Sequence, residues 1–172
     1  SEMMKITSRN NITYKVIFHR LIALKLLIQK NYYKLNELMK KIITAIGLMT
    51  GTSCDGIDIS IIKSDGEDYF KSVVDDFYPF KQNTRQEIKD LKEKIQNFSD
   101  LSKNQLQIKN LERKITMLHV SCINETISKF KISKKEIDVI GFHGQTIFHS
   151  FKEKKSIQLG NGDLLSNLTK LK

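Results

Sequence analysis

The sequence predicts an α/β fold built on a mixed sheet, and three observations indicate it. Strand-like apolar runs follow one another over residues 42–78, helical patterns occupy residues 82–130, and a further strand region leads into a last helix. A domain that contains both strand and helix patterns buries its apolar faces by packing helices against a sheet. The expected order is β-β-β-α-α-β-β-α. A chain of 172 residues, 40% of them hydrophobic, is long enough to bury its own core.

The first three strands are expected at residues 42–48, 57–63 and 69–78. An Asp-Gly dipeptide at 65–66 separates the second from the third, and this dipeptide is typical of tight hairpin turns. Pro79 is the only proline of the chain, and it closes the third strand because proline cannot donate to a sheet. The pattern therefore predicts two consecutive hairpins.

Two helices are expected next. Residues 82–97 carry apolar side chains at helical spacing among charged ones. Ser99 or Asp100 is a suitable N-cap for a longer helix that runs to about Phe130. The apolar stripe of this longer helix consists of Leu101, Ile108, Leu111, Ile115, Leu118, Cys122 and Ile127. We interpret the stripe as a core face.

The last part of the chain returns to strand patterns. A buried strand is expected over residues 136–142, followed by a His-Gly-Gln-Thr loop, a short strand at 156–159 and a helix at 163–170. The two strands would extend the sheet started by the first three.

The connection between the first two strands has an unusual composition. Residues 47–58 read Gly-Leu-Met-Thr-Gly-Thr-Ser-Cys-Asp-Gly-Ile-Asp. Glycines allow backbone N–H groups to converge on an anion, and the hydroxyls add donors. Asp55 and Asp58 are candidate ligands of a metal ion, directly or through water. The segment lacks the Gly-Lys-Ser/Thr ending of a Walker A loop, so it predicts a different phosphate-binding turn; the alternative is a plain hairpin turn.

Two further blocks lie near the end of the chain. Residues 140–149 read Ile-Gly-Phe-His-Gly-Gln-Thr-Ile-Phe-His, and residues 157–163 read Ile-Gln-Leu-Gly-Asn-Gly-Asp. Together with the turn, they resemble the 1,6-anhydro-N-acetylmuramic acid kinase family in type and order. In the family's opening motif, Thr50 stands for a usual Ser and Cys54 for a usual Leu. The resemblance covers about residues 39–172, which corresponds to roughly the first half of a family member.

The resemblance implies a ribonuclease-H-like N-terminal lobe of the actin/sugar-kinase type, with ATP and magnesium as cofactors. The family hydrolyses the 1,6-anhydro bond of the sugar and phosphorylates its 6-hydroxyl, giving N-acetylmuramic acid 6-phosphate for peptidoglycan recycling. Asp55 is the implied metal ligand. The residues implied to bind ATP phosphates and magnesium are Gly51, Thr52, Ser53, Cys54, Asp55, Gly56, Ile57 and Asp58. Those implied to line the sugar cleft are His143, Gly144, Gln145 and Thr146.

The family's segments that supply the general base and the adenosine contacts do not occur in this sequence. By resemblance the base is expected beyond Lys172, so no catalytic residue is assigned and the isolated chain is expected to be truncated and inactive. Two alternatives stay open. A separately encoded C-terminal lobe would restore activity by association, or the chain is a non-catalytic remnant that only binds its ligands. Candidate protein partners are that lobe and a second copy of the chain in a homodimer.

The net charge of +10 is unevenly distributed. Residues 1–41 carry nine Lys/Arg and two acidic residues, so most of the excess lies there. Only four of the 29 basic residues are arginines, which are the side chains that best read phosphates and bases. We therefore expect no nucleic-acid partner, and a basic nucleic-acid-binding module is disfavoured.

Residues 1–38 are interpreted as a leader of uncertain role, either helical or disordered, followed by the kinase lobe at 39–172. Charged residues interrupt the leader's apolar run, which disfavours a membrane span or a secretion signal. Cys54 and Cys122 lack the spacing of a zinc site or a disulfide framework, and a reducing cytoplasm fits them. Cys54 is expected to fill apolar space and not to act as a nucleophile.

Overall fold

The computed structural model describes residues 42–171. Its elements are β1 (Ile43–Thr50), β2 (Gly56–Ser64), β3 (Phe70–Pro79), α2 (Gln82–Lys94), α3 (Asp100–Lys103), α4 (Gln105–Lys129), a 3-10 turn η1 (Lys134–Glu136), β4 (Val139–Ser150), β5 (Lys155–Leu159) and α5 (Gly162–Thr169). The leader assigned to residues 1–38 lies outside the described residues.

The five strands form one mixed sheet in the order β3-β2-β1-β4-β5. β1, β2 and β3 pair antiparallel as two hairpins, β4 runs parallel to β1, and β5 returns antiparallel to β4. A parallel pair needs a long crossover, which α2, α3 and α4 supply. The α/β class and the mixed sheet are thus confirmed. Because β1 and β4 are parallel, their carboxyl ends meet at the same edge of the sheet.

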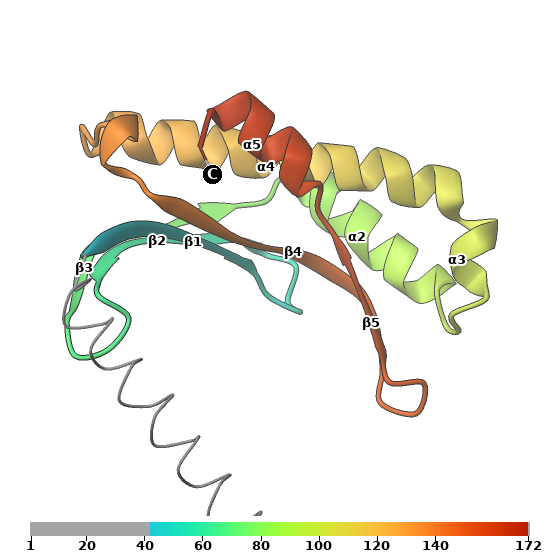
Figure 1. The fold of residues 1–172 in the computed structure, drawn as a ribbon. Coiled ribbons are helices and arrows are strands. Elements are labelled where there is room, and N and C mark those ends of the chain that lie inside the picture. Colours follow the sequence, from blue (N-terminus) through green and yellow to red (C-terminus); the bar gives the residue numbers. More distant parts are fainter. Residues whose placement is uncertain (1–41, 172) are drawn as a thin grey trace, which may run out of the picture. The chain divides into compact units, whose positions relative to one another are not determined.

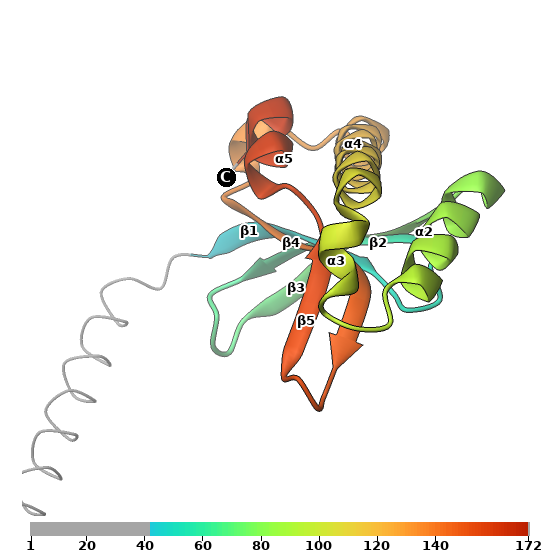
Figure 2. The ribbon, with the colours of Figure 1, turned by 90° about the vertical axis from the view of Figure 1, so that its right-hand side faces the viewer.

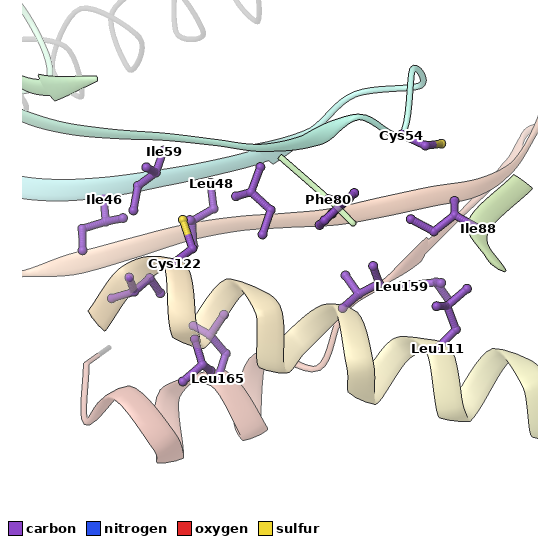
Figure 3. Packing of buried hydrophobic residues seen from close by; sticks show 14 of the residues in the cluster. Ile46, Leu48, Cys54, Ile59, Phe80, Ile88, Leu111, Cys122, Leu159 and Leu165 are labelled. Atoms are coloured by element: carbon purple, nitrogen blue, oxygen red, sulfur yellow. The ribbon is translucent and has the colours of Figure 1, made fainter. Parts of the chain in front are cut away.

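The helices of residues 42–171 lie on one face of the sheet (Figures 1 and 2). In β1 the side chains alternate, so Ile46 and Leu48 face the helices and are buried. Figure 3 shows these side chains between the sheet and α4, together with Cys122 of α4 and Leu165 of α5. Burial of this apolar layer is the main stabilising contribution to such a fold.

The expected second helix is interrupted. α3 ends at Lys103, and α4 begins at Gln105. Between them, the side-chain nitrogen of Asn104 donates to the carbonyl oxygen of Asp100 at 2.8 Å. Asparagine competes with helical backbone bonds in this way, which explains a break that an apolar stripe does not reveal. The expected order of elements therefore lacked one helix.

The expected loop at His143–Thr146 is a second correction. These residues belong to β4, which continues to Ser150. Gln145 pairs with Thr50 of β1 on one side and with Leu159 of β5 on the other. Pairing on both sides keeps the segment extended although Gly144 has a left-handed φ of 72°. The strand also begins later than expected, because η1 occupies residues 134–136.

No helix within residues 42–171 is long and apolar enough to cross a membrane.

Candidate functional site

The turn between β1 and β2 is tightly closed. The backbone nitrogen of Cys54 donates to the carbonyl oxygen of Gly51 at 3.2 Å, and Cys54 itself has a left-handed φ of 57°. The Cys54 side chain is 1% exposed and belongs to the core at this end of the sheet (Figure 3). Core packing thus holds a strained residue in the turn. A thiol placed there fills apolar space, as the sequence predicted.

Gly56, which ends the turn, has no room for a side chain. A Cβ atom at this position would lie 2.4 Å from the carbonyl oxygen of Tyr78 and 2.6 Å from the ring of Phe77. The residue that follows β3 also fixes the turn, because the backbone nitrogen of Phe80 donates to the carbonyl oxygen of Asp55 at 2.8 Å. The turn is therefore a rigid part of the sheet edge.

Polar groups of the turn face solvent. Thr52, Ser53 and Asp55 are exposed, and the Ser53 hydroxyl donates to a carboxylate oxygen of Asp55 at 2.7 Å. This hydrogen bond, together with backbone N–H groups and the charge of Arg85, holds the pKa of Asp55 below its usual value. The Asp55 carboxylate is consequently ionised at neutral pH and accessible to a ligand.

Lys92 brings a cation to the same turn from α2. Its Nζ lies 3.3 Å from the carbonyl oxygen of Thr52 and 3.8 Å from Sγ of Cys54. Sequence reasoning missed this residue, because Lys92 is one of several lysines on a charged helix and no spacing rule connects it to a turn 40 positions away. An ammonium group here adds positive charge where a phosphate would approach.

Strand β4 touches the turn directly. The Thr50 hydroxyl donates to the carbonyl oxygen of Gly144 at 2.7 Å, and Nε2 of Gln145 donates to the carbonyl oxygen of Gly51 at 3.2 Å. At Gly144 a Cβ atom would lie 2.3 Å from the carbonyl oxygen of Leu159. The blocks at 47–58 and 140–149, which are distant in the sequence, are therefore in contact.

A cavity of about 660 Å³ lies on the sheet face away from the helices. Gly47 of β1 and Gly141 of β4 are direct partners in the sheet and both line the cavity, so no side chain covers its floor at this pair. Asp58 and His143 line the same cavity. The remaining lining residues are Leu48, Met49, Ile59, Ser60, Asp75, Asp76 and Phe142.

His143 has an exposed side chain whose Nδ1 lies 3.0 Å from the carbonyl oxygen of Gly144. A carbonyl can only accept, so the hydrogen-bond partner assigns the proton of the neutral ring to Nδ1. Nε2 then carries a lone pair and can accept a hydrogen bond from a hydroxyl group. Among the neighbouring expected cleft residues, Gly144 and Gln145 are buried and Thr146 is half-buried.

The predicted site residues thus fall into three groups. Thr52, Ser53 and Asp55 are exposed in the turn, with Gly51 half-buried at its start. Asp58 and His143 share the cavity on the open face, whose lining does not include Asp55. The other predicted residues point inward: Cys54, Gly56, Ile57, Gly144 and Gln145 are buried, and Thr146 is half-buried.

Within residues 42–171 no group of three or more His, Cys, Asp or Glu side chains is arranged to hold a metal ion. Magnesium in phosphoryl-transfer sites is commonly bound through one or two carboxylates, phosphate oxygens and water. The exposed, ionised carboxylate of Asp55 could supply one such carboxylate ligand, with the other ligands coming from phosphate oxygens and water.

Comparison of the sequence with known proteins identifies relatives of this chain. The family model for anhydro-N-acetylmuramic acid kinase matches residues 43–172. The chain belongs to the anhydro-N-acetylmuramic acid kinase family. An anhydro-N-acetylmuramic acid kinase of Pelagibacter ubique is 44% identical over 132 residues, which is 77% of this chain and 34% of the relative.

Two further relatives have the same name. The anhydro-N-acetylmuramic acid kinase of Agrobacterium fabrum is 34% identical over 138 residues, and that of Rhizobium johnstonii is 34% identical over 131 residues. Each match covers 76% of this chain and 35% of the relative. The chain spans about a third of the length of the curated relatives it matches, and the matched part is their N-terminal part.

Proposed function

We propose that residues 42–171 form the N-terminal lobe of a kinase that acts on 1,6-anhydro-N-acetylmuramic acid, with ATP as phosphoryl donor and N-acetylmuramic acid 6-phosphate as product. The observation that carries the proposal is the contact between the turn and β4. This contact joins the turn, which carries Thr52, Ser53 and Asp55 and is approached by the Lys92 ammonium, to the strand that carries His143. A kinase needs phosphate and acceptor sugar side by side in this way.

The turn is the proposed phosphate site. Thr52 and Ser53 present hydroxyl groups to solvent, and Lys92 adds a positive charge. Catalysis of phosphoryl transfer consists mainly of positioning and neutralising the transferring group. Asp55 is the proposed carboxylate ligand of magnesium, which when bound supplies charge neutralisation for the phosphates.

The open-face cavity is the proposed sugar site. Its volume of about 660 Å³ is within the usual range for small-molecule pockets. His143 offers Nε2 as an acceptor for a sugar hydroxyl, while the glycine pair Gly47 and Gly141 leaves space for a ring. Asp58 of β2, which is separated from β4 by β1, offers a second acceptor in the same cavity.

We also propose that the fold is ribonuclease-H-like. The support is the sheet order, in which an antiparallel three-strand meander is followed by a helical crossover and a strand parallel to the first. A cytoplasmic location belongs to the same proposal, since ATP is required and the two cysteines are free and buried. The general base and the adenosine contacts would come from a C-terminal lobe outside residues 42–171.

A second candidate function is a lobe that binds its ligands without catalysis. Its support is that residues 42–171 offer an exposed turn and a cavity able to hold ligands, while no residue among them is assigned as a general base. The two candidates share the turn and the cavity, and they differ only in whether a second lobe completes the reaction.

Binding of magnesium-ATP to the 172-residue chain, followed by NMR chemical shifts, tests the shared part. We expect shifts at the amides of Thr52, Ser53 and Gly56, and weaker binding by Asp55→Asn. Asparagine can still accept the Ser53 hydrogen bond, so the turn should remain folded. Asp65→Asn is the matched control, because the Asp65 carboxylate also accepts local hydrogen bonds, from the backbone nitrogens of Glu67 and Tyr69, in the other hairpin turn. Equal affinity of Asp55→Asn and wild type would remove Asp55 from the phosphate site.

A further inference from the structure

Thr50 and Gln145 connect the turn to β4 through two hydrogen bonds that run in opposite directions. Thr50 of β1 donates from its hydroxyl to the backbone of β4, at the carbonyl oxygen of Gly144. Gln145 of β4 donates from its amide to the backbone of the turn, at the carbonyl oxygen of Gly51. The two residues are direct partners in the sheet, and each bond joins positions that are 94 residues apart.

The orientation of the Gln145 amide is determined by its neighbours. Nε2 donates to the carbonyl oxygens of Gly51 and Thr146, each at 3.2 Å. Both neighbours are acceptors, so rotation of the amide would place oxygen against oxygen. The side chain is fully buried, and its Oε1 has no partner among the described residues. Gln145 therefore has no surface to offer a ligand, and it acts through the turn.

The Gly51 carbonyl oxygen is the group that closes the turn. It accepts from the backbone nitrogen of Cys54, the strained residue, and from Nε2 of Gln145, both at 3.2 Å. The Gly144 carbonyl oxygen has a similar double role, since it faces both the Thr50 hydroxyl and Nδ1 of His143. The two bonds thus fix the turn on one side and the imidazole on the other.

We infer that Thr50 and Gln145 are positioning residues, which hold the turn in the geometry that receives phosphate and align it with His143. This inference rests on the proposed function of the turn as the triphosphate site. In this role, neither Thr50 nor Gln145 would contact the phosphates. Thr50 is 3% exposed, and its hydroxyl, which the sequence suggested as a donor to phosphate, donates to Gly144 instead.

Three variants of the 172-residue chain test the inference. Thr50→Val removes the hydroxyl at nearly constant volume, Thr50→Ser keeps it, and Gln145→Met removes the two amide donors. Thr126→Val is the matched control, because Thr126 is equally buried and its hydroxyl bonds to that of Tyr78 at 3.0 Å. The measurements are hydrogen exchange at the Cys54 amide and the affinity for magnesium-ATP, each on protein shown to be folded by its NMR spectrum.

We expect Thr50→Val and Gln145→Met to speed exchange at Cys54 by about fivefold or more and to weaken ATP binding by a similar factor, as loss of one hydrogen bond implies. Thr50→Ser should restore both values, and Thr126→Val should change neither. Unchanged affinity in a variant whose turn exchanges faster would overturn the positioning role. Unchanged exchange in both variants would overturn the connection itself.

The outcomes separate this inference from the proposed function. If the wild-type chain does not bind magnesium-ATP, the proposed phosphate site is wrong, and exchange at Cys54 still decides whether the two bonds hold the turn. If Gln145→Met does not fold, the comparison of Thr50→Val with Thr50→Ser decides alone.

Discussion

His119 of α4 packs edge-on against Phe142 of β4, with 4.8 Å between the ring centroids and an angle of 62° between the planes. The imidazole is fully buried, and its Nδ1 lies 2.8 Å from the carbonyl oxygen of Ile115. Its Nε2 has no partner among the described residues. Burial lowers the pKa of His119 to about 4, because the charged form would be desolvated.

The position of His119 predicts that the domain loses stability below about pH 6.5. Above that pH the ring is neutral in both states. Between pH 6.5 and 4 the unfolded chain binds a proton that the native state excludes, so the free energy of unfolding falls. The total loss from this group is about 3 kcal/mol, and it levels off below about pH 4. Urea unfolding at a series of pH values measures it.

His119→Leu should flatten the curve between pH 6.5 and 4. His149→Gln, a change at an exposed histidine on β4, should leave the slope as in the wild type. An unchanged slope in His119→Leu would contradict a buried, neutral imidazole at this position.

Gly144 and Gly66 allow the steric cost of a side chain to be separated from the conformational cost of a left-handed φ. Both have a left-handed φ, 72° and 82°, but only Gly144 lacks space, because a Cβ atom there would lie 2.3 Å from the carbonyl oxygen of Leu159. Gly66→Ala should cost about 1 kcal/mol, from conformation alone. Gly144→Ala should cost about 3 kcal/mol or more, because steric overlap adds to the conformational term. Thermal and urea unfolding measure both; equal losses would mean that β5 does not lie where the structure has it.

Cys54 and Cys122 should resist alkylation in the native protein. Their side chains are 1% and 3% exposed, and burial raises the pKa of Cys122 to about 12. Reactive thiols need access and a stabilised thiolate. Mass spectrometry after a short iodoacetamide pulse at about pH 8, near the pKa of a free thiol, should find both unmodified until denaturant is added. Rapid native labelling of Cys54 would restore the alternative of a nucleophile in the turn.

The sequence predicted the sheet and the turn because their signals are local. The first three strands follow from apolar runs with turn residues between them, and the glycines of the turn mark positions where a side chain does not fit, as at Gly56. The break between α3 and α4 at Asn104 was not predicted, because it depends on one side-chain hydrogen bond. The extended conformation of residues 143–146 was not predicted, because it depends on pairing with β1 and β5.

The candidate site was only partly predictable for a similar reason. Motif residues such as Asp55 and His143 could be named, but their environments could not. Lys92, from a helix, and the cavity on the open face of the sheet are products of tertiary packing. The burial of Gln145 also follows from the parallel pairing of β1 with β4, which no sequence motif encodes.

Gly47 offers a test of the sugar site that leaves the fold intact. A Cβ atom there has no neighbour within 4 Å, and the residue lines the cavity. Gly47→Val should keep or slightly raise stability, since glycine weakens strands, while it narrows the cavity. In an active two-lobe kinase, the variant should raise the KM for the anhydro sugar with little effect on the KM for ATP. Gly162→Ala, also in open space, is the control. An unchanged KM for the sugar would mean that the sugar does not bind in this cavity.

The most direct test of the central claim is a chimera in which residues 43–171 replace the matching N-terminal segment of the Pelagibacter ubique relative, which is 44% identical over 132 residues. The measurement is ATP-dependent formation of N-acetylmuramic acid 6-phosphate from the 1,6-anhydro sugar. If these residues are a working kinase lobe, the chimera should turn over, and Asp55→Asn within it should lower the rate at least about a hundredfold through lost transition-state stabilisation. A folded chimera that binds ATP but forms no 6-phosphate would contradict the account.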